Sequence, residues 1–428
     1  RKAVSSRRPQ EPPPDLTARA IMSGRATASS RILIAGAGIA GLSAALALAR
    51  TGRPVSVLEK RARSTEEGAG IQIGPNGTKI LQSLGLAPHL AEKIAVPGGI
   101  RVMDGLTGAR LTEFPLGGEI ERRHGAPYWV LHRADLHMAL RAAVAAEPDV
   151  ELVDAAEVVD ATSNGESATA VLANGQVLEG ACLIGADGLW SALRTRALHG
   201  APLAFTGKCA LRTVVPAQAA PSGISRKDTT IWLRPKAHVV HYPVRGGADL
   251  AIVAIFDDAD LGESWGRDAA PSLIATQAQN FPAPLRDLLH QPALWRQWSL
   301  YAPTAPMRWV ANRIALIGDA AHPALPFLAQ GGVMAMEDAA VLAAVLKGCG
   351  DDEIPARLAA FERIRHPRTT RVMEASIRNG RAYHLDGGMR LARNAVLSAT
   401  PPHLFMRQYD WLYGWKIEDA LKTARIPV

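Results

Sequence analysis

The chain has 428 residues, of which 48% are hydrophobic and 21% charged, a composition typical of a globular enzyme with two or three domains. The formal net charge is +8, but residues 1–31 contribute +5 of it, because that segment has seven basic and two acidic residues. The remainder is nearly neutral and does not interleave basic with aromatic residues, which excludes nucleic acid as a partner. No apolar run is long enough to predict a membrane span.

The cysteines and the N-terminal segment bear on the compartment. Cys182, Cys209 and Cys349 are odd in number and far apart, which indicates a reducing compartment without a disulfide framework or a metal site. Residues 1–30 are expected to be a disordered extension, because they contain a Pro-rich stretch. The segment also resembles a transit peptide in being rich in Arg and Ser. The alternative is an upstream extension or cloning remnant before a natural start at Met22, with the protein in the cytoplasm.

The first chemical motif begins at Gly36. A strand-like apolar run over 31–35 precedes Gly36-Ala37-Gly38-Ile39-Ala40-Gly41, and a helix-like stretch over 42–49 follows. A second strand over 54–58 ends in Glu59. The order of strand, glycine turn, helix, strand and acid predicts a dinucleotide-binding site.

Each motif residue has a physical reason to be there. Gly36 allows a tight turn, Gly38 lets the backbone approach a pyrophosphate, and Gly41 lets helix and strand pack closely. The helix N-terminus offers free N–H groups to phosphates, and Glu59 can accept hydrogen bonds from ribose hydroxyls. The alternative is a turn that only packs a helix against a strand.

The rest of the chain is predicted to be α/β with inserted β segments. A glycine-rich turn over 68–77 leads into an amphipathic helix over 78–86, and another helix begins with the segment His132–Leu136 and runs through Ala146. The further expected elements are strands over 150–153, 158–161, 211–215, 229–233, 238–242, 250–256 and 313–317, a helix over 332–346, and an Arg-rich helical tail over 355–379.

Two later motifs indicate which nucleotide is bound. A buried strand that begins at Cys182 ends in Asp187-Gly188 and turns into a helix carrying Ser and Arg. A second strand ends in Gly318-Asp319, and a proline-rich loop then leads to Gly331-Gly332 at the start of a helix. An acid at the carboxyl end of a strand can bind a ribityl or ribose hydroxyl. The helix N-terminus can serve a phosphate or an electron-rich ring edge.

Together the three motifs resemble those of the FAD-dependent aromatic hydroxylases, single-component flavoprotein monooxygenases of the salicylate and 3-hydroxybenzoate hydroxylase kind. The similarity runs from about Arg31 to the end and includes Gly68–Asn76, His132–Leu136 and Tyr409–Gly414. It implies a Rossmann-like FAD-binding domain of three ββα layers, an inserted and mainly antiparallel β-sheet substrate domain, and C-terminal helices. The implied ranges are 31–105, 126–202 and 300–350 for FAD, 106–125 and 203–299 for the substrate, and 351–428 for the helices.

The resemblance also implies roles by position. Arg133 resembles an arginine that contacts FAD phosphates; the alternative is a surface charge on a helix. Asp187 resembles an acid linked to FAD and to the nicotinamide donor; the alternative is a helix N-cap. Gln72 resembles a residue near the flavin, or is a solvent-facing turn residue. The full set implied to bind FAD is Gly36, Gly38, Gly41, Glu59, Lys60, Gln72, Arg133, Val158, Asp187, Asp319, Gly331, Gly332 and Val333.

The implied reaction needs little acid–base chemistry from the protein. NADH or NADPH reduces bound FAD, and the reduced flavin activates O2 as a C4a-hydroperoxide that transfers oxygen to a phenolic ring. A base with a pKa near 7 would assist by deprotonating the phenol. His238 is the candidate, because on a strand it shares a face with Tyr242 and the two can meet one ligand, while His241 points away. The alternative is a strand histidine with satisfied hydrogen bonds beside a core tyrosine.

The substrate implied is a phenolic aromatic acid, similar to hydroxybenzoate or salicylate, or an N-heteroaromatic analogue. Pro326 and Phe327 are expected to form an apolar wall of its pocket. Hydroxylases of 6-hydroxynicotinate have histidines where this chain has Gln72 and Phe327, which argues against that substrate. The 3-hydroxybenzoate 6-hydroxylases tend to have a glutamine in place of Pro326. An arginine should pair with the carboxylate, but the sequence does not identify one.

Other functions stay open at this point. One is an FAD oxidoreductase or epoxidase without aromatic hydroxylation, another a simple nicotinamide dehydrogenase, and a third a flavin-binding protein without activity. The dehydrogenase would explain Gly36 to Glu59 but not the Gly318-Asp319 loop. We expect a cytoplasmic monomer or homodimer whose partners are an aromatic substrate, O2 and NAD(P)H.

Overall fold

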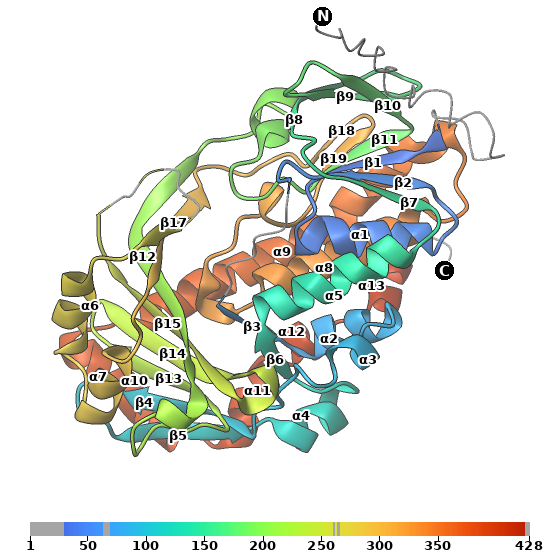
Figure 1. Ribbon diagram of the computed structural model, residues 1–428. Helices are drawn as coiled ribbons and strands as arrows, with labels where there is room; N and C mark the ends of the chain where they lie inside the picture. The colour runs from blue at the N-terminus through green and yellow to red at the C-terminus, as the bar shows by residue number, and fades with distance from the viewer. Residues whose placement is uncertain (1–29, 63–68, 260–261, 263–265, 424–428) are drawn as a thin grey trace, which may run out of the picture.

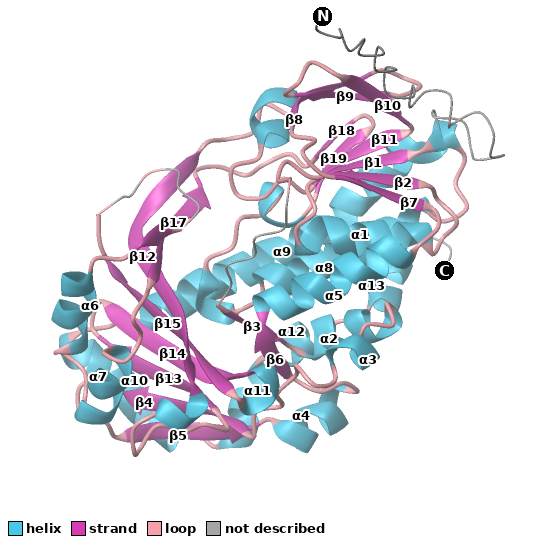
Figure 2. Ribbon diagram, viewed as in Figure 1, coloured by secondary structure: helices cyan, strands magenta, loops and turns pink. Residues whose placement is uncertain are grey.

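The computed structural model describes residues 30–62, 69–259, 262 and 266–423. The predicted N-terminal extension, except Ser30, lies outside the described residues. Figures 1 and 2 show two regions of sheet, with helices gathered under the smaller region and along the outside of the larger one. The predicted α/β fold class is confirmed.

A six-stranded sheet carries the first motif. Its strands are parallel except β18, and the four central strands are buried along their length, as expected for a sheet covered on both faces. In order they are β18 (Val310–Ala311), β19 (Ile314–Leu316), β11 (Cys182–Gly185), β1 (Ile32–Ala35), β2 (Val55–Leu58) and β7 (Val150–Val153).

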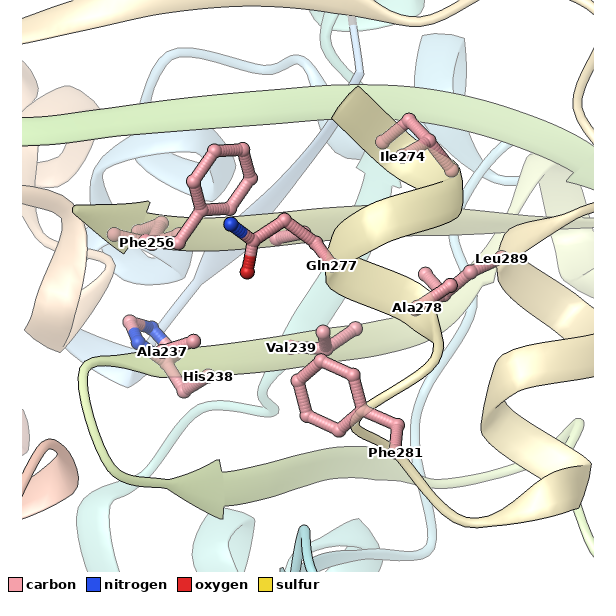
Figure 3. A pocket seen from close by; sticks show the side chains of 11 residues that line it. Ala237, His238, Val239, Phe256, Ile274, Gln277, Ala278, Phe281 and Leu289 are labelled. Atoms are coloured by element: carbon pink, nitrogen blue, oxygen red, sulfur yellow. The ribbon is translucent and has the colours of Figure 1, made fainter. Parts of the chain in front are cut away.

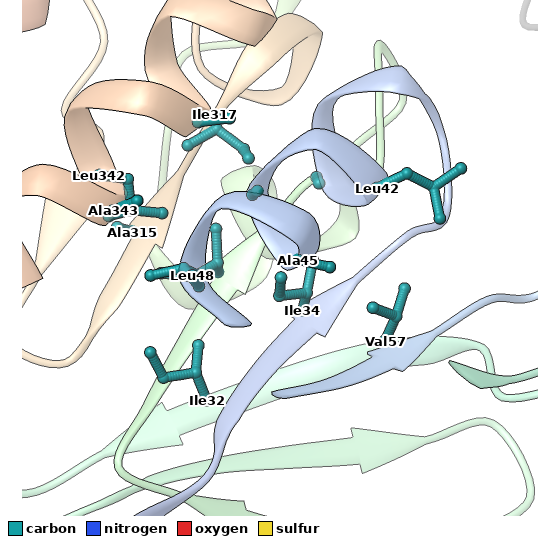
Figure 4. Packing of buried hydrophobic residues seen from close by; sticks show 14 of the residues in the cluster. Ile32, Ile34, Leu42, Ala45, Leu48, Val57, Ala315, Ile317, Leu342 and Ala343 are labelled. Carbon is teal, nitrogen blue, oxygen red and sulfur yellow. The ribbon is translucent and has the colours of Figure 1, made fainter. Parts of the chain in front are cut away.

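Helices cover one face of this sheet and a small sheet covers the other, which gives the three predicted ββα layers (Figure 1). The helices are α1 (Ile39–Ala49), α5 (Arg133–Ala146), α8 (Gly331–Leu346) and α9 (Ile354–Tyr383). The small antiparallel sheet consists of β8 (Val158–Ser163), β9 (Ala168–Leu172) and β10 (Val177–Gly180). Figure 4 shows the core between the six-stranded sheet and its helices, where Ile32, Ile34 and Val57 face Leu42 and Leu48 of α1.

An eight-stranded sheet forms the second region, and all its pairs are antiparallel except β13 with β4. In order the strands are β16 (Arg267–Asp268), β17 (Arg296–Pro303), β12 (Leu203–Pro216), β15 (Asp249–Asp257), β14 (Ala237–Val244), β13 (Thr229–Arg234), β4 (Gly99–Asp104) and β5 (Arg110–Pro115). Its outer face packs against α6 (Pro271–Ala278) and α7 (Ala283–Leu289).

One predicted boundary differs from the sheet arrangement. The range 31–105 was assigned to FAD binding, but β4 pairs with β13 and β5 and so belongs to the larger sheet. The boundary there falls before Gly99. The reason is that the sequence of β4 contains no signal of which strand it pairs with, since pairing depends on β13, far along the chain.

Short elements connect the two regions, and short helices form the C-terminal part of the chain. The two-stranded ribbon β3–β6 lies between the sheets, and it is followed along the chain by small helices. The remaining elements named here are β3 (Gly70–Ile73), β6 (Trp129–His132), α2 (Pro75–Ser83), α3 (Ala87–Leu90), α4 (Gly117–His124), α10 (Gly387–Ala399), α11 (Pro402–Gln408), α12 (Asp410–Tyr413) and α13 (Ile417–Thr423).

The described residues contain neither a candidate membrane span nor a candidate metal cluster. Across the described ranges, no helix is long and apolar enough to cross a membrane. Within the same part of the chain, no group of three or more His, Cys, Asp or Glu side chains is arranged to hold a metal ion.

A buried cluster of charges ties α8 to α9. Glu337 and Asp338 are fully buried neighbours on α8. Arg365 of α9 donates to both, with N–O distances of 2.7 Å to Glu337 and 2.7 Å to Asp338. Arg368 adds a 3.0 Å contact to Glu337. The second oxygen of Asp338 accepts from the Gly318 backbone at 2.9 Å, so the cluster also holds the Gly318-Asp319 turn.

We expect Arg365→Met to destabilise the fold strongly, because it removes the cation that two buried carboxylates share and leaves Glu337 with Arg368 alone. The free energy of unfolding should fall by about 3–5 kcal/mol, measured by urea denaturation followed by circular dichroism. Arg363→Ala, at an exposed position of the same helix, is the matched control and should change it little. Equal stability of the two variants would contradict this account of the cluster.

Candidate functional site

A cavity of about 420 Å³ lies between the two regions and draws its lining from both. It brings together residues from the ends of β1, β2 and β11, from the Gly318 turn and α8, and from the inner face of the eight-stranded sheet. The predicted site residues that line it are Gly36, Gly38, Glu59, Lys60, Gln72, Arg133, Val158, Asp187, His238, Tyr242, Asp319, Pro326, Gly331 and Gly332.

The glycine turn is packed too tightly for side chains at two of its three glycines. Gly36 has a φ of +106°, and a Cβ there would lie 2.5 Å from the carbonyl oxygen of Ala186. A Cβ on Gly41 would lie 1.9 Å from the carbonyl oxygen of Gly36, which is the close packing expected of this residue. Gly38 differs, because a Cβ there would meet no atom within 4 Å. Gly38 therefore borders open space in the cavity.

The acid after β2 is fixed by the backbone. Glu59 accepts a hydrogen bond from the backbone N–H of Ala37 at 2.8 Å and another from that of Arg61 at 3.0 Å. These two bonds hold its carboxylate at the cavity beside the glycine turn. The carboxylate oxygens keep lone pairs that can accept from a ligand hydroxyl.

Two helices begin at the cavity without side-chain caps. The N-cap of α1 is Gly38, which has no side chain, and that of α8 is Gln330, whose side chain accepts no hydrogen bond from its helix. First-turn N–H groups have no partner within a helix, and the helix dipole makes this end positive. The cavity thus has two places suited to phosphate or to an electron-rich ring edge.

The two carboxylate oxygens of Asp187 have different surroundings. One oxygen accepts from the backbone N–H of Leu193 at 3.2 Å, at the start of the helical turn Leu193–Ala197, whose N-cap is Ala192 and not Asp187. The other oxygen is buried and has no hydrogen-bond partner in the described part of the chain. Burial raises the pKa of this carboxyl. A ligand hydroxyl donating to the second oxygen would satisfy it.

The Asp187 and Asp319 motifs are joined by Arg194, whose role the sequence analysis did not assign. Its guanidinium donates to the carbonyl of Ala320 at 3.2 Å and to that of Leu189 at 2.6 Å. Asp319 stands on the turn that this bond holds, and its side chain is exposed toward the cavity.

The opposite wall comes from β14 and its neighbours. His238, Val240 and Tyr242 line the cavity, as expected for one face of a strand, while His241 does not. Tyr128 donates to the side-chain oxygen of Gln72 at 2.9 Å, which orients the Gln72 amide at the cavity.

His238 has a different environment from the one the sequence suggested. It is 2% exposed, and its Nδ1 lies 2.8 Å from Nε2 of His384, which follows α9. Burial, and then His384, lower the pKa of His238 well below its ordinary value. The expectation of a base with a pKa near 7 is therefore wrong for the free site, because burial disfavours the imidazolium.

Three predicted residues do not line the cavity. Val333 is fully buried, and its methyl groups lie against Gly77. Gly41 serves packing only. Phe327 was expected in the substrate wall, but it is buried behind that wall, with its ring centroid 5.5 Å from that of His238.

A small pocket of about 10 Å³ lies on the outer face of the eight-stranded sheet, between β14, β15 and α6. Figure 3 shows it lined by side chains such as Phe256, Phe281 and Ile274. This volume is at the lower limit of what a single water molecule needs.

Arg212 is the side chain that sequence reasoning missed on the substrate-facing wall. It lies on β12, in register with Val253 and Val240 of the next two strands, and lines the cavity. Its Nε is buried and has no hydrogen-bond partner among the described residues. The sequence feature that could have identified Arg212 is a single arginine within an apolar strand. His384 was missed as well, and its position at the end of a long helix gave no signal.

The residues present fit FAD. The cavity offers an open glycine cradle, two uncapped helix ends and a buried carboxylate oxygen without a partner. A dinucleotide with a long hydroxyl-bearing linker and a flat ring system needs these groups along its length.

Comparisons with known proteins agree with this fit. A family model described as FAD binding domain matches residues 29–376. The chain is 35% identical to 3-hydroxybenzoate 6-hydroxylase from Klebsiella oxytoca, over 92% of this chain and 98% of that protein. It is 34% identical to 3-amino-4-hydroxybenzoate 2-monooxygenase from Streptomyces cremeus, over 93% of this chain and 96% of that protein.

The fold is also that of a solved structure titled salicylate hydroxylase substrate complex. The TM-score is 0.77 at 24% sequence identity, covering 94% of this chain and 99% of the other. The protein is an oxidoreductase that uses FAD, and the chain belongs to the FAD-dependent aromatic hydroxylases, the single-component flavoprotein monooxygenases.

Proposed function

We propose that this monooxygenase hydroxylates a benzene ring bearing a phenol and a carboxylate, with NADH or NADPH as the reductant. The observation that carries the proposal is the wall on which Arg212, His238 and Tyr242 line one cavity opposite two uncapped helix ends. The first of these residues suits a carboxylate and the second a phenol. The two relatives compared above are named for substrates that combine the same two groups.

Separate groups of residues would bind separate parts of the cofactor. The N-terminus of α1 with Gly36 and Gly38 would hold the pyrophosphate, supported by Arg133, and Glu59 would accept from the adenosine ribose. Lys60 and Val158 would border the adenosine. Asp187 and Asp319 would bind the linker hydroxyls, while Gln72, Gly331 and Gly332 would lie beside the ring. Reduced FAD supplies the activation of O2.

Arg212 is our candidate partner for the substrate carboxylate. No salt bridge to it exists among the described residues, although its guanidinium packs on the Trp298 ring at 5.3 Å from the centroid. Burial, and then Arg133, lower its pKa, while Tyr242 and Asp319 raise it. An arginine stays charged in proteins, so a half-buried guanidinium with no acid beside it among the described residues is unfavourable. A substrate carboxylate would remove that penalty.

His238 would accept the phenol proton. Its lowered pKa keeps the imidazole neutral at physiological pH, so a ring nitrogen with a free lone pair is available. Tyr242, on the same face, would hydrogen-bond the substrate. Pro326 gives the pocket an apolar border where 3-hydroxybenzoate 6-hydroxylases tend to have glutamine, so we do not assign the ring position that is hydroxylated.

The alternatives explain less of the cavity. A simple nicotinamide dehydrogenase needs neither the Asp319 turn nor the wall of the larger sheet. An oxidoreductase or epoxidase without a phenolic substrate leaves Arg212 and His238 without a role. The three cysteines are buried and lie far apart in the sequence, which is common in a reducing compartment, and we infer a cytoplasmic location. A monomer or homodimer remains our prediction.

A screen of hydroxylated aromatic acids should identify the substrate class. We expect hydroxybenzoates to stimulate NADH or NADPH oxidation by the FAD-loaded protein and to yield a dihydroxybenzoate, detected by mass spectrometry. Benzoates without the hydroxyl group should give no hydroxylated product. Stimulation by neutral phenols alone would contradict the assignment of an acid.

Gly38→Ala should weaken FAD binding, whereas Gly41→Ala should destabilise the apoprotein. Gly38→Ala should leave the thermal midpoint of the apoprotein unchanged, because the new Cβ meets no atom within 4 Å. It should weaken FAD binding about 10-fold or more, since the methyl group occupies the space of the pyrophosphate. Gly41→Ala should unfold the apoprotein more readily, because its Cβ would lie 1.9 Å from a carbonyl oxygen. Flavin titration and thermal denaturation distinguish the two.

Arg212→Met should selectively weaken acidic ligands. We expect the dissociation constant of 3-hydroxybenzoate to rise about 30-fold, from loss of about 2 kcal/mol of charged hydrogen bonding. The dissociation constant of 3-hydroxybenzamide, which lacks the charge, should stay unchanged. Ligand-induced changes in flavin absorbance measure both. Equal weakening of acid and amide, or loss of FAD itself, would place Arg212 elsewhere in the site.

A further inference from the structure

The Gln72 amide on β3 presents one end to the cavity and is held at the other by a buried tyrosine. Gln72 lines the cavity, and Tyr128, which lies just before β6, donates its O–H to Oε1 of Gln72 at 2.9 Å. Among the residues that the structure describes, the Gln72 side chain makes no second hydrogen bond. The group left for a ligand is therefore Nε2, with two N–H donors.

The surroundings of Tyr128 favour this orientation of the amide over the opposite one. Tyr128 is 3% exposed. Burial, and then the neighbouring Tyr413, raise the pKa of Tyr128 well above its ordinary value, so the hydroxyl keeps its proton. If the Gln72 amide were turned over, Nε2 would face that hydroxyl, and the buried proton would lose its acceptor on Gln72.

Tyr413 supports Tyr128 from the side away from Gln72. The two tyrosine rings meet edge to face with centroids 6.0 Å apart. Their side chains are also within hydrogen-bonding reach of each other. With Tyr413 donating, the proton of Tyr128 is left for Gln72. The Tyr413 ring also packs on the turn after β3, because a Cβ on Gly74 would lie 2.7 Å from it.

The strand that carries Gln72 is packed against both walls of the cavity. A Cβ on Gly70 would lie 2.4 Å from the ring of Tyr242, which belongs to the substrate-facing wall. A Cβ on Gly332, at the start of α8, would lie 2.9 Å from the side chain of Ile71. The backbone of β3 is thus closely confined. The freedom that remains at Gln72 is the rotation of its amide, which the Tyr128 hydroxyl restricts.

We propose that Tyr128 is a positioning residue that turns the N–H end of the Gln72 amide toward the flavin ring and thereby raises the reduction potential of bound FAD. This inference deepens the proposed function and rests on its placement of Gln72 beside the ring. Tyr128 is not one of the described residues that line the cavity, so it acts through Gln72.

The sign of the effect follows from charge. The carbonyl oxygens of the flavin ring become more negative when the ring is reduced, and a hydrogen bond to a negatively charged acceptor is stronger. An N–H donor at such an oxygen therefore stabilises the reduced form more than the oxidised form. An amide that presents Oε1 instead would repel the same oxygen and lower the potential.

The test measures the reduction potential of the FAD-loaded protein without substrate, by equilibration with a dye of known potential. Tyr128→Phe keeps the ring and removes the hydroxyl, which frees the amide to turn. At a fixed potential the ratio of reduced to oxidised flavin should fall about 10-fold, which corresponds to about 30 mV for a two-electron couple. Gln72→Ala should lower the potential as well, because it removes the N–H donor.

A double variant separates positioning from a general effect on the fold. If Tyr128 acts through Gln72, then Tyr128→Phe should shift the potential no further in a protein that already carries Gln72→Ala. Tyr413→Phe should lower the potential in the same direction but by less, and it serves if Tyr128→Phe loses FAD.

Tyr409→Phe is the matched control. It removes a hydroxyl from a tyrosine of the same cluster, whose ring centroid lies 6.1 Å from that of Tyr413. That hydroxyl accepts from Asn379 at 3.4 Å and does not meet Gln72. The potential should stay unchanged in this variant.

The outcomes distinguish this inference from the proposed function. An unchanged or higher potential in Tyr128→Phe, or a shift that is the same with and without Gln72, overturns the positioning role alone. If Gln72→Ala leaves the potential unchanged, the flavin ring does not lie beside Gln72, and the placement of the cofactor fails together with the inference. The substrate assignment is unaffected in either case, since no substrate is present.

Discussion

Two neighbouring carboxylates buried on α8 impose the constraint on which the cavity depends. Glu337 and Asp338 have no access to water, so they must be met by cations and N–H groups at close range. Arg365 meets both from α9, and Asp338 also accepts from Gly318. A shift of either helix would break these bonds and leave a charge unpaired in the core. The start of α8 and the Asp319 turn are thereby fixed at the cavity.

The two walls of the cavity differ in how strongly they restrict the residue types at their positions. The cofactor wall relies on backbone N–H groups at helix ends and on glycines that leave room for them, so few side-chain types are specified there. The opposite wall consists of side chains on β12, β15 and β14, where alternate residues face inward. Substitutions at Pro326 or Val253 can therefore alter the shape of the substrate space without disturbing the residues that would bind FAD.

Local patterns were enough to predict the fold class and most of the cofactor wall. Gly36, Glu59, Asp187 and Asp319 follow the carboxyl ends of strands, and such ends meet at one edge of a parallel sheet. The substrate wall could be predicted only in part. His238 and Tyr242 share a face by simple alternation, but Arg212 joins them only because β15 pairs with both β12 and β14. His384 and the displaced Phe327 depend on how α9 packs, which no local pattern contains.

The strand order of the six-stranded sheet has a consequence during synthesis on the ribosome. β1 pairs on one side with β2, which follows it closely, but on the other with β11, through Ile32 and Cys182. β11 in turn awaits β19, and two of the helices that cover the sheet, α8 and α9, come later still. Pairings that join distant segments form slowly and leave strand edges open meanwhile. The nascent chain must therefore stay shielded from aggregation until nearly all of it has emerged, and FAD can be captured only at that late moment.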